Sequence, residues 1–384
     1  MAYDVSIVPC KSYDPAECRA ALETVLSPIG GLDWVTPGMK IAVKLNLVSA
    51  MKPDAAATTH PALITALTEL LKERGAAAVI LGDSPGGLYN AAHLNHVYDV
   101  CGLRACEKAG AVLNQNFEQA VAEDPAAVQA RSFQYTTWLD GADAIIDFCK
   151  LKTHGMMGMT NAVKNFFGVI PGTMKPEYHY KYPVTEDFAD MLVDLCEHFK
   201  PRLSICDAVF GMEGNGPTQG TPRFIGALAA SMDPHALDLA CAKILGFTSA
   251  DVPTLVAARK RDLVPSSPDF LSVSGDPDAF VVPDIQKTPA QKSVFFSTGR
   301  KDILGKIADG ILVRVLMPFP KLSSKDCIGC KKCADICPAK AITMENGKPA
   351  IDRSKCIHCF CCQEFCPKGA MRVGRTAIAR LLNK

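Results

Sequence analysis

Eight cysteines near the C-terminus fall into two runs with the same spacing. The runs are Cys327-x-x-Cys330-x-x-Cys333-x-x-x-Cys337-Pro338 and Cys356-x-x-Cys359-x-x-Cys362-x-x-x-Cys366-Pro367. Chains that hold a pair of 4Fe-4S clusters have this spacing, because each cubane needs four thiolates at the corners of a tetrahedron. Three cysteines on one tight loop supply three of the four. The sequence therefore predicts two 4Fe-4S clusters.

The fourth thiolate of each cluster is expected from the opposite run, since the cysteine before proline ligates the other cluster in two-cluster proteins. The expected ligand sets are Cys327, Cys330, Cys333 and Cys366 for one cluster, and Cys356, Cys359, Cys362 and Cys337 for the other. Zinc sites instead pair two C-x-x-C knuckles, and a cytosolic chain would not keep so many disulfides. Cys361 is left as a spare thiol beside the second cluster.

The segment from about 323 to 373 resembles a bacterial-type two-cluster ferredoxin. Besides the cysteines, the resemblance includes Ala339-Lys-Ala-Ile342 and Lys368-Gly-Ala-Met371, where the chain turns from cluster loop to strand. It implies a small α+β domain that transfers single electrons at low potential. By itself it names no substrate.

The rest of the chain is long enough for a separate domain. With 384 residues, of which 48% are hydrophobic, the chain can bury a sizeable core. We predict an α/β domain over 1–300, a linker over 301–322 and the ferredoxin-like domain over 323–384. The sequence shows no secretory signal and no membrane span. Eight further cysteines are scattered singly, as reduced thiols would be, so we expect a cytoplasmic protein.

The net charge of +1 conceals a basic C-terminal part. Residues 321–384 carry 13 Lys and Arg against 5 Asp and Glu. Each oxidised cluster with its thiolates adds only about −2, so this part stays basic. We expect it to attract a small acidic electron donor, such as a ferredoxin or a flavodoxin. Nucleic acid is not expected, because only Phe360 and Phe365 could stack on bases.

Apolar runs alternate with helical patterns through the first 250 residues. Strands are expected near 5–8, 40–48, 76–82, 144–148, 203–206 and 224–230, and helices near 15–26, 60–74 and 186–199. This alternation predicts an α/β fold, with a mostly parallel sheet and helices on both faces. Ligands of such sheets bind beyond the carboxyl ends of the strands, so polar residues there are candidates for a site.

The densest group of such residues follows the strand expected at 144–148. Lys150, Lys152 and His154 share one side of an extended segment, and Lys164 follows Thr160, which could cap a helix. Single lysines are usually solvated. The cluster, together with a helix N-terminus, favours a site for a small anionic substrate.

Other strand ends add further candidates. Asp83 lies in the turn Gly82-Asp-Ser-Pro-Gly-Gly87, which lacks a nucleotide-binding glycine pattern and could bind a ligand or satisfy its own backbone. Asp207 precedes a glycine-rich loop that contains Glu213, and Lys44 and Asn46 could join the site from a neighbouring strand. The candidate catalytic residues are Lys152, His154, Lys164, Asp83 and Asp207.

Six segments together resemble the family called domain of unknown function 362, whose members often end in a two-cluster ferredoxin module. They are Lys44-Leu-Asn-Leu-Val48, Gly82-Asp-Ser-Pro85, Lys150-Leu-Lys-Thr-His154, Ala162-Val-Lys-Asn-Phe-Phe-Gly168, Asp207-Ala-Val-Phe-Gly-Met-Glu-Gly214 and Asp233-Pro-His-Ala-Leu-Asp238. The resemblance implies a cytosolic iron-sulfur protein, and the family's name leaves its chemistry open.

Two classes of function are considered. The first is an iron-sulfur reductase, in which lysines hold the substrate and histidine supplies protons to a polarised C=C or C=O bond. The second is a non-enzymatic electron carrier or redox-responsive binding protein. A carrier would not need a large domain with a polar constellation, so we favour the enzyme. A flavin inside the α/β domain is a further possibility, but the sequence contains no flavin fingerprint to support it.

Overall fold

The computed structural model of the chain describes residues 3–288 and 317–376. Most of the predicted linker, 301–316, lies outside these described residues. Its last residues, Phe319–Leu322, form the strand β12 of the C-terminal module. The domain boundaries predicted at 300 and 323 stay a prediction.

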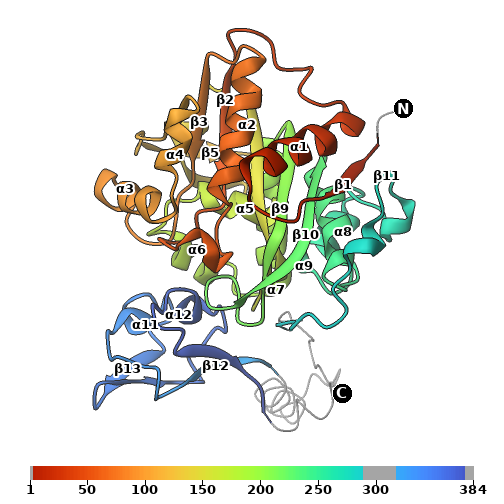
Figure 1. Cartoon of the computed structure of the whole chain (residues 1–384). Helices are drawn as coiled ribbons and strands as arrows, with labels where there is room; N and C mark the ends of the chain where they lie inside the picture. The colour runs from red at the N-terminus through yellow and green to blue at the C-terminus, as the bar shows by residue number, and fades with distance from the viewer. Residues whose placement is uncertain (1–2, 289–316, 377–384) are drawn as a thin grey trace.

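A nine-stranded sheet forms the centre of the N-terminal domain (Figure 1). Its order is β11 (Val273–Ser274), β1 (Val5–Pro9), β10 (Thr221–Ser231), β9 (Leu203–Glu213), β7 (Ala144–His154), β2 (Lys40–Leu45), β3 (Ala78–Gly82) and β4 (Ala111–Leu113), while β8 (Gly158–Thr160) folds back on β7. Only β10 and β8 run antiparallel to the strands beside them. The predicted, mostly parallel sheet is confirmed.

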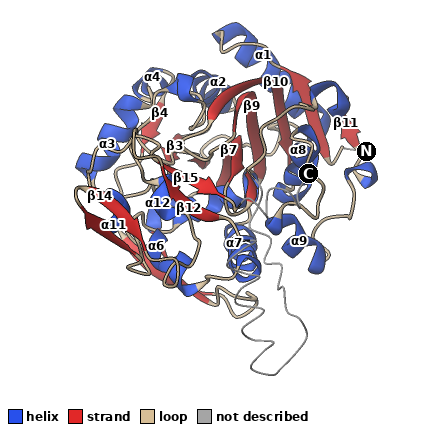
Figure 2. Ribbon diagram, turned by 90° about the horizontal axis from the view of Figure 1, so that it is seen from below, coloured by secondary structure: helices blue, strands red, loops and turns tan. Residues whose placement is uncertain are grey.

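Helices cover both faces of this sheet (Figure 2). On one face α1 (Pro15–Leu26) and α2 (Pro61–Glu73) pack over Val43, and on the other α7 (Thr185–Phe199) packs over Ala42. Neighbouring strand residues thus face opposite cores, as the two-residue period of a strand requires. Further helices are α3 (Ala91–Val100), α4 (Arg104–Lys108), α6 (Lys175–Lys181), α8 (Pro234–Ile244) and α9 (Pro253–Lys260).

The two central strands extend further than the sequence predicts. The strand β7 continues to His154, where its end pairs with β8, and β9 continues to Glu213, where its end pairs with β10. Lys150 lies opposite Asp207, and Lys152 lies opposite Thr160. These polar residues therefore lie within the strands, whereas the strand ends predicted at 148 and 206 would have put them beyond the strands.

The prediction that Thr160 caps a helix is wrong. The helix α5 (Ala162–Asn165) has Asn161 at its N-cap position, and that side chain makes no capping bond. The carboxylate of Asp238, on α8, accepts instead from the backbone N–H groups of Ala162 (2.8 Å) and Val163 (3.3 Å). This helix start is already occupied by a carboxylate and is not free for an anionic ligand.

The C-terminal module is a small α+β domain that lies beneath the sheet in Figure 1. Its elements are β12, α11 (Lys332–Asp335), β13 (Ile342–Glu345), β14 (Lys348–Ile351), α12 (Cys361–Glu364) and β15 (Met371–Gly374). β12 pairs with β15, and β13 pairs with β14. The two halves repeat each other, since Lys331 and Phe360 occupy equivalent loop positions with positive φ angles of 67° and 61°.

Candidate functional site

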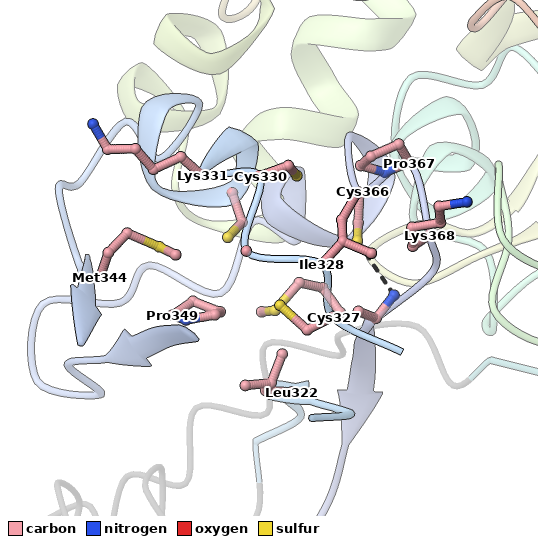
Figure 3. Close-up of a pocket in the computed structure, with 14 residues that line it drawn as sticks. Leu322, Cys327, Ile328, Cys330, Lys331, Met344, Pro349, Cys366, Pro367 and Lys368 are labelled. Carbon is pink, nitrogen blue, oxygen red and sulfur yellow. Dashed lines mark hydrogen bonds between the residues drawn. The ribbon is translucent and has the colours of Figure 1, made fainter. Parts of the chain in front are cut away.

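The eight predicted cluster ligands line two small cavities in the C-terminal module. Cys327, Cys330, Cys333 and Cys366 line the first cavity (Figure 3), and Cys337, Cys356, Cys359 and Cys362 line the second. Each Cys-Pro cysteine thus joins the triplet of the other run, in the crossed arrangement that the spacing predicts. Among the residues described, no His, Cys, Asp or Glu side chains gather as they would around a single metal ion.

The surroundings of these cysteines fit a 4Fe-4S cluster. Ile328, Met344 and Met371 give the first cavity apolar walls. The backbone N–H of Ala370 donates to Cys366 Sγ at 3.2 Å, and at the equivalent place Ala341 donates to Cys337 Sγ at 3.3 Å. Hydrogen bonds to the sulfurs and burial are the means by which a protein sets a cluster's potential. Cys361 lines the second cavity and is buried, as a spare thiol.

A cavity of about 980 Å³ lies between the two domains. The N-terminal domain contributes polar side chains to its wall, among them Asn46, Asp83, Ser84, Lys152, Lys164, Lys175 and His179. The module contributes Glu364, Phe365, Cys366 and Pro367. Cys366 therefore lines both this cavity and the first cluster cavity. Anything bound here lies next to a predicted cluster ligand.

Lys152 is held at the wall of the interdomain cavity by two acceptors. Its Nζ donates to Asn46 Oδ1 at 2.8 Å and to the carbonyl oxygen of Ala57 at 2.6 Å. The side chain is buried, and burial, followed by the positive charges of Lys164 and Lys150, lowers the pKa of Lys152 to about 7. Its ammonium group has a third N–H that can serve a ligand, and it changes charge close to neutral pH.

Asp83 also lines the cavity, but its carboxylate is already fully engaged. Asp83 Oδ1 forms a buried ion pair with Lys44 Nζ at 2.8 Å, and Oδ2 accepts from the backbone N–H of Leu47 at 2.6 Å. Gly168 permits this pairing, since a Cβ there would overlap both partners. Asp83 also accepts from the backbone N–H of Ser84 at 2.8 Å. Its carboxylate therefore holds the cavity wall in place and has little capacity left for a ligand.

His154 lies behind the cavity wall and contacts the C-terminal module. Its Nδ1 accepts from the backbone N–H groups of Met156 and Met157, both at 3.1 Å. Burial, and then the charge of Lys164, lowers the pKa of His154 to about 4, so the ring is neutral and its proton is on Nε2. That nitrogen lies 2.9 Å from Glu364 Oε1. His154 reaches the cavity only through Glu364.

The carboxylate of Glu364 stays ionised in this setting. Burial opposes its ionisation, but the hydrogen bond and charge of His154 and the charge of Lys164 lower the pKa of Glu364 to about 2. Glu364 therefore brings a negative charge from the module into a cavity with three nearby lysines. Glu364 could not be predicted from the sequence, because no local pattern shows which side chain of the module faces the other domain.

Two more cavity residues were missed, Lys175 and His179 on α6. Lys175 Nζ donates to the carbonyl oxygen of Ile170 at 2.8 Å, and burial lowers its pKa to about 7. His179 is 3% exposed and stacks on Phe188 with 4.3 Å between ring centroids. Burial lowers the pKa of His179 to about 3. The spacing of four residues, which puts both on one helix face, was the signal available in the sequence.

Some polar atoms around the cavity have no partner in the part of the chain that the structure describes. Ser84 Oγ and His179 Nδ1 are buried without a hydrogen bond. Lys164 Nζ lies 5.8 Å from the ring centroid of Phe167, with no hydrogen-bond acceptor among the described residues. Buried polar groups are rarely left unpaired, so Ser84 Oγ and His179 Nδ1 mark where a polar ligand would bind, and the half-buried Lys164 lines the same cavity.

Comparison with known proteins identifies the family. Residues 41–243 match the family model described as Domain of unknown function (DUF362). The chain belongs to this family. Residues 319–367 match a 4Fe-4S dicluster domain, which supports binding of 4Fe-4S clusters and an iron-sulfur electron-transfer role. A thylakoid-associated protein of Synechocystis sp. is 32% identical over 297 residues, which cover 73% of this chain and 87% of that protein.

Two solved structures are similar to parts of this DUF362 protein. The lactate racemase apoprotein from Thermoanaerobacterium thermosaccharolyticum matches with a TM-score of 0.41 and 14% identity, over 64% of this chain and 57% of that one. A Thermotoga maritima protein matches with a TM-score of 0.35 and 12% identity, over 57% and 56%. The DUF362 chain thus spans a little more than half of each solved chain.

Asp207 of the DUF362 domain is separate from the interdomain cavity. It is fully buried, pairs with Lys150 Nζ at 2.8 Å, and accepts from the Tyr13 hydroxyl at 2.9 Å and the His60 backbone N–H at 3.0 Å. Lys150 is therefore part of this buried hydrogen-bonded group and not of the interdomain cavity. The structure thus brings Lys152, Lys164 and Asp83 to one cavity and leaves Asp207 outside it.

The glycine-rich loop after β9 contacts the ferredoxin module, and its residues Pro217, Thr218 and Gln219 also line the interdomain cavity. The side-chain amide of Gln363 donates to the carbonyl oxygen of Asn215 at 2.8 Å, and the Thr218 hydroxyl donates to that of Glu364 at 2.9 Å. These bonds hold α12 against the end of β9.

None of the helices that the structure describes is long and apolar enough to cross a membrane.

Proposed function

We propose that this DUF362 protein is an iron-sulfur reductase that reduces a small anionic substrate in the cavity between its two domains. The observation that carries the proposal is the position of Cys366, which lines both the first cluster cavity and the interdomain cavity. Lys152 and Lys164, which keep N–H groups free for a ligand, line the same interdomain cavity. The site therefore combines a predicted electron source with groups that suit a negative charge.

The substrate's anionic group would bind at Lys164 and Lys152. Lys164 has no acceptor of its own among the described residues, and Lys152 keeps one N–H for a ligand. Ser84 Oγ and His179 Nδ1 add unpaired buried polar atoms to the same wall. Charge-assisted hydrogen bonds of this kind are stronger than neutral ones and orient the bound molecule.

The reaction proposed is the addition of two electrons and two protons to a polarised C=C or C=O bond. When bound, the clusters supply the electrons one at a time. Two molecules of a reduced, one-electron carrier protein of acidic charge become oxidised for each product. Lys152, with a pKa of about 7, is suited to give one of the two protons at neutral pH, and solvent supplies the other. His154 positions Glu364 and is not itself the donor, which changes the role that the sequence suggested.

We place the protein in the cytoplasm because its eight cysteines outside the module are free and buried. We propose no nucleic-acid partner. A flavin in the interdomain cavity is an alternative carrier for the electrons, since binding sites for such molecules measure roughly 300–1,000 Å³. An absorbance spectrum of protein purified without air would separate flavin bands from cluster bands.

Substrate-dependent oxidation of the reduced protein tests the proposal. The protein is reduced with dithionite under anaerobic conditions, freed of excess reductant and mixed with a panel of 2-enoates and 2-oxo acids. A substrate should restore the oxidised cluster absorbance and yield the saturated or hydroxy acid, and Lys164→Ala should weaken the response. If no anion of either class binds to protein with intact clusters, the chain is an electron carrier and not this reductase.

A further inference from the structure

The internal repeat of the C-terminal module offers two versions of the same cluster loop. Ile328 corresponds to Ile357, and Lys331 corresponds to Phe360, because each lies at the same distance from the cysteines of its run. Lys331 and Phe360 even share the left-handed backbone conformation, with φ of 67° and 61°. The loops therefore have the same shape and differ in their side chains.

The second loop is covered by the N-terminal domain. Phe360 and Cys361 are each 1% exposed. Phe360 lies against Gly155, where an added Cβ would come within 3.9 Å of the ring. The neighbouring Gln363 donates to the carbonyl oxygens of Asn215 and Gly216. This loop is thus used as a docking surface within the chain.

The first cluster loop, which corresponds to the second by the internal repeat, is exposed to solvent. Ile328 is 62% exposed, and Cys330 is the one exposed cysteine among those that the structure describes. Lys331 and Lys368 line the cluster cavity and are exposed to solvent at its rim (Figure 3). An apolar centre with a charged rim is the usual composition of a protein–protein interface.

The charge of the first loop selects the kind of partner. Lys325, Lys331, Lys332 and Lys368 are exposed around it, whereas the nearby carboxylate of Asp326 is paired with Arg372 at 3.0 Å. A basic rim steers an acidic protein toward the surface and aligns it by charge complementarity. The partner that fits is a small acidic protein with its redox group near its own surface.

We propose that a small acidic electron-carrier protein docks on the donor surface, defined as Ile328, Cys330, Lys331 and Lys368. Each encounter oxidises the carrier by one electron and reduces the chain by one. Electrons then arrive at the cysteine set that includes Cys366, which also adjoins the interdomain cavity. This inference rests on the proposed function only in taking the chain to receive electrons, since docking requires no substrate.

Binding measurements with an acidic flavodoxin test the donor surface directly. The oxidised flavodoxin is immobilised, and cluster-loaded wild-type protein is compared with a Lys331→Glu/Lys368→Glu double variant at low ionic strength. The matched control is Lys340→Glu/Lys355→Glu, which changes the net charge of the same module equally but lies beside the second cluster. Iron content and cluster absorbance verify that each variant is folded and loaded.

The donor surface predicts a loss of affinity of about 10-fold or more for the first variant, together with a weaker salt dependence, and less than about 2-fold for the control. Ile328→Ser should also weaken binding. Equal losses in both double variants, or a wild-type protein that does not bind flavodoxin, would overturn the proposal. Intact docking with no substrate found in the panel would count against the proposed reductase and not against this surface.

Discussion

His154 on β7 and Glu364 on α12 meet across the boundary between the two domains, with 2.9 Å between Nε2 and Oε1. The two residues are 210 positions apart in a chain of 384. Because both Nδ1 hydrogen bonds of His154 come from its own turn, the ring can offer only Nε2–H to the module. This pairing helps to place Cys366, two residues after Glu364, at the interdomain cavity.

Removal of the Glu364 carboxylate should loosen this junction. In Glu364→Ala the buried Nε2 of His154 loses the carboxylate oxygen that lies 2.9 Å away, and a buried polar group left without a partner costs about 1–3 kcal/mol. Glu364→Gln keeps an acceptor oxygen and should recover most of that loss. Thermal unfolding, followed by cluster absorbance under anaerobic conditions, would show the difference. Equal midpoints for the alanine variant and the wild type would mean that the pair does not stabilise the junction.

The crossed ligand sets predict about eight iron atoms in the chain, four in each cluster. Cys366→Ser should alter the EPR signal of one reduced cluster, and Cys337→Ser should alter that of the other. Iron analysis and low-temperature EPR of the dithionite-reduced protein would measure both effects. About four irons in the wild type, or zinc in place of iron, would disprove the two-cluster prediction.

Lys164 should contribute to binding and not to folding. A hydrogen bond to a charged group is worth about 1.5–3 kcal/mol, so Lys164→Ala should weaken binding of an anionic substrate by roughly 10- to 100-fold. Because the side chain has no acceptor among the described residues, the thermal midpoint should stay close to that of the wild type. Lys164→Arg, which keeps the charge, is the control. Unchanged affinity in the alanine variant would place the anion elsewhere.

The charge of Lys152 should make anion binding depend on pH near neutrality. Its pKa is lowered from the usual 10.5 to about 7, so the ammonium form is present below that pH and is lost as the pH rises through it. The affinity for an anion should therefore fall above about pH 7. Lys152→Arg should bind with a flatter profile, because arginine stays protonated. A rise in affinity between pH 7 and 9 in the wild type would contradict this assignment.

The sequence was sufficient for the repeated local patterns and insufficient for contacts between distant segments. Fixed spacing puts Cys327, Cys330 and Cys333 on one loop, and the three line one cavity. Alternation predicts Lys150 and Lys152 on one side of an extended segment, and both lie in β7. Lys150 nevertheless bonds to Asp207, and Lys152 bonds to Asn46, so the two lysines belong to separate groups of polar side chains. Such separation depends on which neighbouring strand supplies the partner.

The cap of α5 shows the same limit. Thr160 has a suitable residue type and position, but Asp238 from a helix 76 residues away takes the role. The glycine-rich loop after Asp207 is a second example, because glycine lets a backbone approach any partner closely. The close partner is the module itself, through Asn215 and Thr218. A glycine-rich loop has the same composition whether it contacts a ligand or another domain, so only the fold shows which of the two it contacts.

A substrate in the interdomain cavity should lie against the cluster for which Cys366 is a predicted ligand. Pulsed ENDOR of the dithionite-reduced protein, with the tightest-binding ¹³C-carboxylate of the panel, measures this proximity directly. The proposal predicts a ¹³C hyperfine coupling to one reduced cluster, which disappears in Lys164→Ala while the EPR signals of both clusters stay. A carboxylate that binds with the wild-type affinity but shows no coupling to either cluster would contradict it.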